Sequence, residues 1–270
     1  MKRLFWSSHA VRRATFGAVL WSVYAGVVIA TLPRVLHTDT ALDAMLAFVL
    51  GLLMAVRINR AYERWWEGRT LWGTLVNASR NLAVKIRTFV RPEVEEAERV
   101  HALITAFAYG LRDHLRGGAR LDRLPGFDEN EVADHVPSAV VVAVYGCFRD
   151  WTAAGRVTQD ELRMLDLEGR IMLDVAGGCE RIRNTSLPPS LTWVTRIAVA
   201  SALMLAPWAA AEELGWWLVP VAGGVAFLML VAETIANSLE HPFGTELNQL
   251  DLTEISRAIE TSTGEILGAE

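Results

Sequence analysis

The chain has 270 residues, of which 52% are apolar and 21% are charged. Soluble domains of this length are usually about 45–50% apolar, so the excess is small and its distribution is more informative than its size. No Lys or Arg lies between Ser201 and Ser256, and residues 14–33 carry no charge at all. Two cysteines cannot form a disulfide framework, and a net charge of −5 gives no reason to expect a nucleic-acid partner. Composition therefore argues against a disordered chain, a secreted disulfide scaffold and an ordinary soluble enzyme, and predicts an integral membrane protein.

Four apolar stretches are long enough, or nearly so, to cross a hydrocarbon core about 30 Å thick, which takes about 20 helical residues. These predicted spans are 14–33, 40–57, 191–211 and 214–235. Basic residues gather before the first span and after the second, whereas the last hairpin holds two glutamates and no base. Because basic residues favour the cytoplasmic side, both termini are predicted to face the cytoplasm. A basic start and an apolar run also describe a secretory signal, but this run is longer than the usual signal core.

The polar remainder of the chain, about 58–190 and 241–270, is mainly helical in pattern. Thr158 followed three residues later by Glu161 predicts a capped helix start. The second span runs into the polar residues after Val56 without Pro or a Gly pair, which predicts one long rod. We therefore expect a single domain over 1–270.

The second span carries two stripes of side chains at helical spacing. One is small (Ala44, Ala47, Gly51, Ala55) and would allow close helix packing in lipid. The other is bulky (Phe48, Leu52, Val56) and advances in steps of four residues, with a drift of about 40° per step. Two interpretations stay open: both stripes pack or face lipid, or the bulky stripe faces a lumen and forms a hydrophobic constriction.

Residues 57–73, RINRAYERWWEGRTLWG, resemble the bestrophin family, and most closely its bacterial members. Residues 179–188, CERIRNTSLP, and 241–246, HPFGTE, agree with that family in order and spacing. The resemblance covers essentially the whole chain. It implies an all-α integral membrane protein with four transmembrane helices per protomer, continuing into a cytoplasmic helical region. It also implies a homopentameric ion channel around a central pore.

The resemblance assigns roles to particular residues. In the family, three second-span residues at steps of four form the pore neck, and counting back from Arg64 gives Phe48, Leu52 and Val56. A second, cytosolic aperture falls near Asp160, where relatives commonly carry an aliphatic residue. Animal members hold calcium in an acidic run after Pro-Phe-Gly. Only Glu246 is acidic in the corresponding run here, so gating by a calcium clasp is not expected.

The predicted function is conduction of small monovalent ions across the bacterial inner membrane, with a weak preference for cations. Bacterial relatives look cation-selective, and Asp39 and Asp43 at the outer mouth, with a ring of Asp160, would favour cations. An anion (chloride) channel of the same architecture is the alternative. From another class, a secondary transporter is suggested by Pro207 and Pro220, which are expected to interrupt two spans. A non-conducting membrane scaffold is the remaining alternative.

No nucleophile–base pair or phosphate loop appears, and the six histidines show no metal-ligand spacing. We therefore expect no enzyme activity, catalytic residue, cofactor or metal. The expected partners are four further copies of the chain, monovalent ions and the lipid bilayer. Glu233, inside the fourth span, is expected to pair with a basic residue rather than to serve a proton relay.

Overall fold

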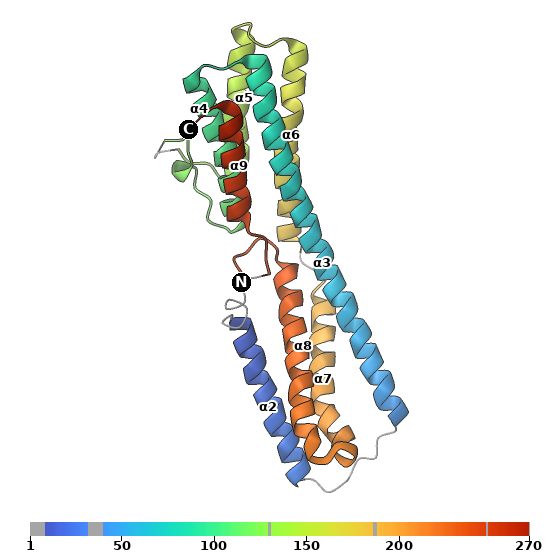
Figure 1. Ribbon diagram of the computed structural model, residues 1–270. Helices are drawn as coiled ribbons and strands as arrows, with labels where there is room; N and C mark the ends of the chain where they lie inside the picture. The colour runs from blue at the N-terminus through green and yellow to red at the C-terminus, as the bar shows by residue number, and fades with distance from the viewer. Residues whose placement is uncertain (1–8, 32–39, 129–130, 186–187, 247, 270) are drawn as a thin grey trace. The chain divides into compact units, whose positions relative to one another are not determined.

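A computed structural model describes residues 9–31, 40–128, 131–185, 188–246 and 248–269. For residues 9–10, 40–44, 46–47, 189, 191 and 212 it describes the backbone alone. Over these ranges all regular structure is helical and no strand occurs, which confirms the predicted all-α class (Figure 1). In chain order the helices are α2 (His9–Thr31), α3 (Thr40–Lys85), η1 (Ile86–Val90), α4 (Val94–Leu115), η2 (Leu121–Arg123), α5 (Val136–Ala153), α6 (Gln159–Asn184), α7 (Pro189–Leu214), η3 (Gly215–Trp217), α8 (Leu218–Glu240) and α9 (Leu252–Leu267).

The chain divides into two compact units, each assembled from segments far apart in the sequence. The first holds α2, the beginning of α3, α7 and α8. The second holds the rest of α3, then α4, α5, α6 and α9, together with Pro242–Thr245. A single channel domain over 1–270 stays a prediction.

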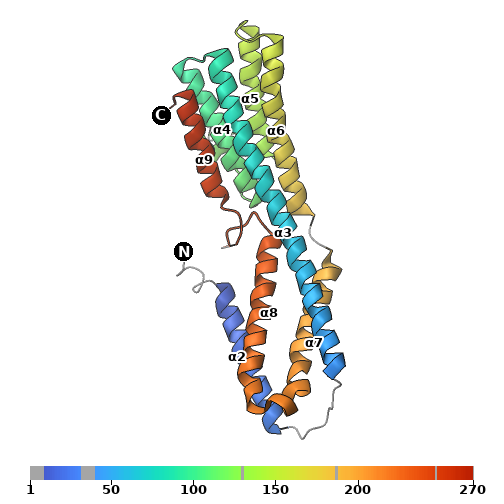
Figure 2. The ribbon, with the colours of Figure 1, turned by 45° about the vertical axis from the view of Figure 1, so that its right-hand side comes forward.

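The first unit contains the candidate membrane spans. In the part of the chain that the structure describes, three helices are long and apolar enough to cross a membrane: Val11–Thr31, Thr192–Ala211 and Gly215–Glu240. In Figure 1 and Figure 2, α2 lies beside α8, and α7 and α8 form a hairpin around η3. The fourth predicted span, 40–57, is the first part of α3, and for several of its residues the structure describes the backbone alone.

The two prolines do not interrupt their spans, so this expectation from the sequence is wrong. Pro207 lies inside α7, which continues without a break to Leu214. Pro220 is the third residue of α8, where a backbone N–H has no intrahelical partner to lose. The observation that favoured a transporter therefore has no counterpart in these helices.

Helix α3 confirms the predicted rod. It runs for 46 residues from Thr40 to Lys85 and then widens into the π-helical turn η1. Arg91, with φ of 49°, ends this segment in the left-handed conformation. The chain reverses there into α4, close to the break that Pro92 predicts.

The second unit is an antiparallel helical bundle. Ion pairs fix the register between α3 and α6. Lys85 at the end of α3 bonds Glu168 at 2.7 Å, and Glu67 in the middle of α3 pairs with Arg181 in the last turn of α6. Thr158 caps α6 by accepting from the backbone of Glu161, as the sequence predicts. The core is made of large side chains that water does not reach, namely Trp72, Leu75, Leu82, Ile86, Phe107, Phe148, Leu165 and Met172.

Candidate functional site

The bulky stripe of α3 (Phe48, Leu52, Val56) is exposed in a single protomer. Phe48 is 71% exposed, Leu52 54% and Val56 42%. Neighbouring residues Met45 and Val49 are also exposed, so exposure alone does not distinguish the stripe. Apolar side chains of this size on a membrane helix are covered either by lipid or by another protein surface. Their role as a pore neck stays a prediction.

A charged triad lies next to this stripe in the first unit. Arg57, the residue after Val56, is only 1% exposed, and its Nη1 donates to a carboxylate oxygen of Glu233 on α8. Arg196 on α7 donates from Nε to the other oxygen of Glu233 at 2.8 Å. The predicted pairing of Glu233 with a base is therefore confirmed, with two bases rather than one.

The charged triad has fewer hydrogen-bond acceptors than its two guanidinium groups have donors. Among the described residues, Nε and Nη2 of Arg57 are buried without a hydrogen-bond partner. Two guanidinium groups share one carboxylate, which leaves a formal charge of +1. Arg57 is buried but Arg196 is 49% exposed, so solvent partly shields this charge. An unpaired buried donor costs about 1–3 kcal/mol, or more when it is charged.

The tryptophans of residues 57–73 do not form one cluster. Trp66 is 56% exposed, whereas Trp72 is fully buried in the second unit. Trp65 stacks on Tyr62 with ring centroids 6.0 Å apart. Trp72 therefore belongs to the core of the second unit.

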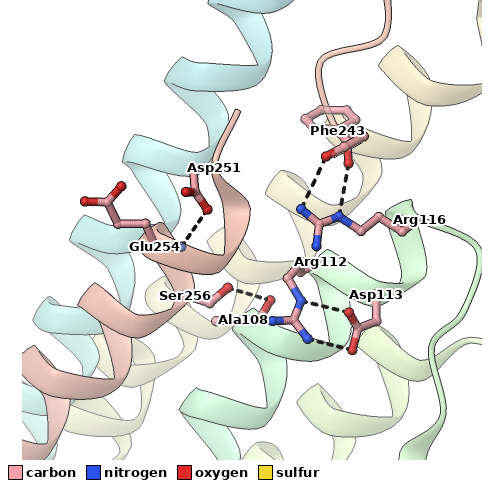
Figure 3. Close-up of polar contacts among 9 residues, drawn as sticks. Ala108, Arg112, Asp113, Arg116, Phe243, Asp251, Glu254 and Ser256 are labelled. Carbon is pink, nitrogen blue, oxygen red and sulfur yellow. Dashed lines mark hydrogen bonds and ion pairs between the residues drawn. The ribbon is translucent and has the colours of Figure 1, made fainter. Parts of the chain in front are cut away.

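Two of the stretches that resemble the bestrophin family, residues 57–73 and 241–246, contact each other in the second unit. Phe243 is almost fully buried, and a Cβ at Gly68 would come within 3.1 Å of its ring. Arg116, near the end of α4, donates from Nε to the Phe243 carbonyl at 3.4 Å and from Nη2 to the Gly244 carbonyl at 3.3 Å (Figure 3). The Pro-Phe-Gly stretch is therefore held by both packing and hydrogen bonds.

The segment after Pro-Phe-Gly leads into α9, which packs on α4. The backbone N–H of Leu250 donates to the Pro242 carbonyl at 2.9 Å and closes the loop. Asp251 caps α9 by accepting from the backbone of Glu254, and Ser256 bonds the carbonyl of Ala108 (Figure 3). These contacts give the loop a structural role.

Gly178, near the end of α6, packs against the later part of the α3 tryptophan stretch. A Cβ at Gly178 would lie 3.0 Å from Leu71, so the two helices approach closely there. Cys179 is completely buried, and burial raises the pKa of its thiol to about 12. Burial also raises the pKa of Cys147. Neither thiol is therefore suited to nucleophilic chemistry at neutral pH.

The remaining predicted charges are only partly described. Asp39 lies outside the described residues, and of Asp43 the backbone alone is described. Asp160 lies in the first turn of α6, is 83% exposed, and pairs with Arg163 at 3.2 Å. An exposed pair of this kind contributes little to stability. Its place at a cytosolic aperture stays a prediction.

One cluster was not foreseen from the sequence. His114, His135 and Glu180 place their ligand atoms within 4.8 Å of one another, although the histidines were expected to be scattered. The first two are 21 residues apart, and the third is 45 residues further on. No linear spacing predicts such a set. It arises from the packing of the end of α4 against the start of α5 and against α6.

Comparison with known proteins identifies the family. A profile of the bacterial/fungal bestrophin protein family matches residues 3–265. A protein of Mesorhizobium japonicum named "voltage-dependent anion channel-forming protein" is 31% identical, over 92% of this chain and 83% of its own length. One of the same name from Nostoc is 29% identical, over 93% of this chain and 88% of its own length.

The fold agrees with these sequence matches. A crystal structure of a bacterial bestrophin homologue from Klebsiella pneumoniae superposes with a TM-score of 0.86. The alignment covers 96% of this chain and 99% of that one, at 24% identity, a level at which the likeness concerns the fold. The profile match over nearly the whole length establishes that this chain is a member of the bacterial and fungal bestrophin family of membrane ion channels.

Proposed function

We propose that five copies of this chain surround one central pore and conduct small monovalent ions through a hydrophobic neck. Phe48, Leu52 and Val56 form the neck, one set from each protomer. A ring of such side chains narrows the path and controls conduction by excluding water. Membership of a channel family supports conduction, and the neck is the finer part of the proposal.

The observation that supports the neck is the occurrence of an exposed bulky stripe, at steps of four residues, beside a stripe of small residues on α3. All three side chains are large, apolar and at least 42% exposed in the protomer. The described part of the adjacent small seam is open as well: Ala55 is exposed, and an added Cβ at Gly51 would meet nothing within 4 Å. A helix that presents a small face beside a bulky face is suited to packing against identical neighbours around an axis.

The proposed setting is the bacterial inner membrane with both chain ends in the cytoplasm. Arg12, Arg13, Arg57 and Arg60 lie near the ends of the first two spans on one side. The hairpin between α7 and α8 carries Glu213 and no base. This asymmetry follows the preference of basic residues for the cytoplasmic face.

For charge preference, we propose weak selectivity for cations, as the sequence predicts. Five copies of Asp160 would raise the local cation concentration at a cytosolic aperture. Arg163 offsets part of that charge, so the preference is expected to be small. The two outer acids, Asp39 and Asp43, would act in the same direction.

Anion conduction is the second candidate, and a specific observation favours it. The curated relatives from Nostoc and Mesorhizobium japonicum are both named as anion channel-forming proteins. The net +1 charge of the Arg57–Glu233–Arg196 triad, in which Arg196 is half-exposed, acts in the same direction.

Planar-bilayer recording of the purified protein tests both parts of the proposal, conduction and charge preference. Conductance with a reversal potential that follows the sodium gradient supports cation selectivity, and one that follows chloride supports the second candidate. An oligomer mass of five chains is expected in detergent. A protein that assembles and incorporates but never conducts would contradict the channel proposal and favour a scaffold.

A further inference from the structure

We propose that His114, His135 and Glu180 form a binding site for a divalent transition-metal ion of the zinc class in the second unit. The site joins the end of α4, the start of α5 and the last turns of α6. Its place is separate from the bulky stripe of α3, and it takes no part in the proposed neck.

The geometry brings three suitable ligand atoms to one point. Nε2 of His114 lies 2.9 Å from Oε1 of Glu180, and Nε2 of His135 lies 2.6 Å from the same oxygen. The two imidazole rings are 4.9 Å apart, edge to face. Ligands of a tetrahedral zinc ion lie about 3.3 Å from one another, as its bond lengths of about 2.0–2.1 Å require. To hold the ion, the Glu180 oxygen would move away from the two nitrogens by about 0.4 and 0.7 Å. The two nitrogens, which lie within 4.8 Å of each other, would also settle about 3.3 Å apart.

The surroundings of His135 suit a ligand. His135 is the N-cap of α5, and its Nδ1 lies 2.7 Å from Oγ of Ser138. Without metal, Nδ1 also accepts from the backbone N–H of Ser138 at 3.2 Å. With the metal on Nε2, the ring proton lies on Nδ1, which then donates to this hydroxyl in place of accepting from the backbone. A partner of this kind on the second ring nitrogen orients metal-ligating histidines.

The donor set selects the class of metal. Two neutral imidazoles and one carboxylate match zinc and similar ions, whereas magnesium and calcium prefer oxygen ligands alone. The side chains are 20–41% exposed, so an ion can reach them from water. Arg183, which bonds the His114 carbonyl at 2.9 Å, places one positive charge nearby, and Glu180 offsets it.

Without the ion, the same three residues form a hydrogen-bonded network, with Glu180 accepting from both rings. This network is the competing explanation of the geometry. The two explanations differ in stoichiometric metal binding, which a polar network alone does not produce.

The experiment uses the full-length protein, purified in detergent without a histidine tag and freed of metal with EDTA. Zn²⁺ is titrated against a chromogenic chelator, and Co²⁺ absorption reports the coordination geometry. We expect one ion per chain, a tetrahedral Co²⁺ spectrum and no competition from Mg²⁺. Zinc is also expected to raise the unfolding temperature by roughly 5 °C at a hundredfold excess over Kd.

Two ligand variants and one control make the test specific. His135→Asn keeps a side chain that can cap α5, and Glu180→Gln keeps its size. Each is expected to lower zinc affinity at least about 100-fold, since even partner residues behind the ligands contribute 10–100-fold. His241→Asn, which removes an exposed histidine outside the cluster, is expected to bind as the wild type does.

Two results would overturn the site: wild-type protein that binds no stoichiometric zinc, or ligand variants that bind as tightly as the wild type. If either variant fails to fold, the wild-type stoichiometry and Co²⁺ spectrum remain decisive. The conductance of the channel does not enter this test, so failure of the metal site and failure of the proposed channel are distinguishable.

Discussion

Gly68 and Phe243 lie so close that a Cβ atom at residue 68 would approach the Phe243 ring to 3.1 Å. Gly68 belongs to the α3 stretch with the paired tryptophans, and Phe243 belongs to the Pro-Phe-Gly stretch. The contact explains in physical terms why these two distant motifs occur together, because the glycine provides the space that the phenylalanine ring fills.

We predict that Gly68→Val destabilises the second unit by about 1–3 kcal/mol, the usual cost of overpacking a core. Gly73→Val, five residues along the same helix, is the matched control. A Cβ there meets only the end of the flexible Arg69 side chain, at 3.5 Å. The control is expected to change stability by less than about 0.5 kcal/mol. Thermal unfolding in detergent measures both, and equal melting temperatures for the two variants would contradict the packing account.

Removing the carboxylate of Glu233, which Arg57 and Arg196 share, should destabilise the protein more than Gly68→Val does. Glu233→Gln leaves Arg57, which is 1% exposed, without its counter-charge. Breaking a buried pair from one side costs about 3–5 kcal/mol.

The control for that variant is Glu63→Gln. Glu63 pairs with Arg60 at 3.2 Å, but both side chains are more than half exposed, so the expected loss is below about 1 kcal/mol. Unfolding temperature and the yield of assembled oligomer report the difference. If Glu233→Gln is as stable as Glu63→Gln, the charged triad does not stabilise the first unit.

Acid stability should depend on Glu96. The hydrogen bond from Arg156, at 2.6 Å, lowers the pKa of Glu96 below its ordinary value, against an opposing effect of burial. Because the folded pKa is lower than the unfolded one, the unfolded chain binds more protons between the two values. The stabilisation is therefore present at neutral pH and is lost as pH falls below about 4.3 and through the folded pKa.

The measurement compares unfolding temperatures at about pH 6 and about pH 3.5 for wild type and Glu96→Gln. Glutamine preserves the capping position at the start of α4 but cannot titrate. The unfolding temperature of Glu96→Gln is therefore expected to fall less on acidification than that of the wild type. Arg156→Ala and the double variant should show the same reduced loss. A Glu96→Gln variant with the full wild-type acid sensitivity would show that this pair does not control it.

The sequence predicted the elements well because their signals are local. Apolar length indicated the spans, the absence of breakers after Val56 indicated the long α3 helix, and Thr158 with Glu161 indicated a capped helix. The effect of Pro207 was misjudged because a proline in a membrane helix can be accommodated by its neighbours, which the sequence does not display.

The site was predicted less completely because it depends on contacts between distant segments. The pairing partner of Glu233 could be expected to be basic, but only the packing of three helices shows that Arg57 and Arg196 share it. His114 and His135 come together through the antiparallel packing of α4 and α5, which leaves no trace in their spacing. The proposed neck would depend on contacts between protomers, and these lie outside the fold of one chain.

Single-channel conductance of alanine variants at Phe48, Leu52 and Val56 tests the central claim most directly. Val49→Ala, on a neighbouring face of the same helix, is the control. The account predicts that each neck variant, and Leu52→Ala above all, widens the constriction and raises conductance while the control stays at the wild-type value. Wild-type conductance in all three neck variants would contradict the proposal that this stripe lines the pore.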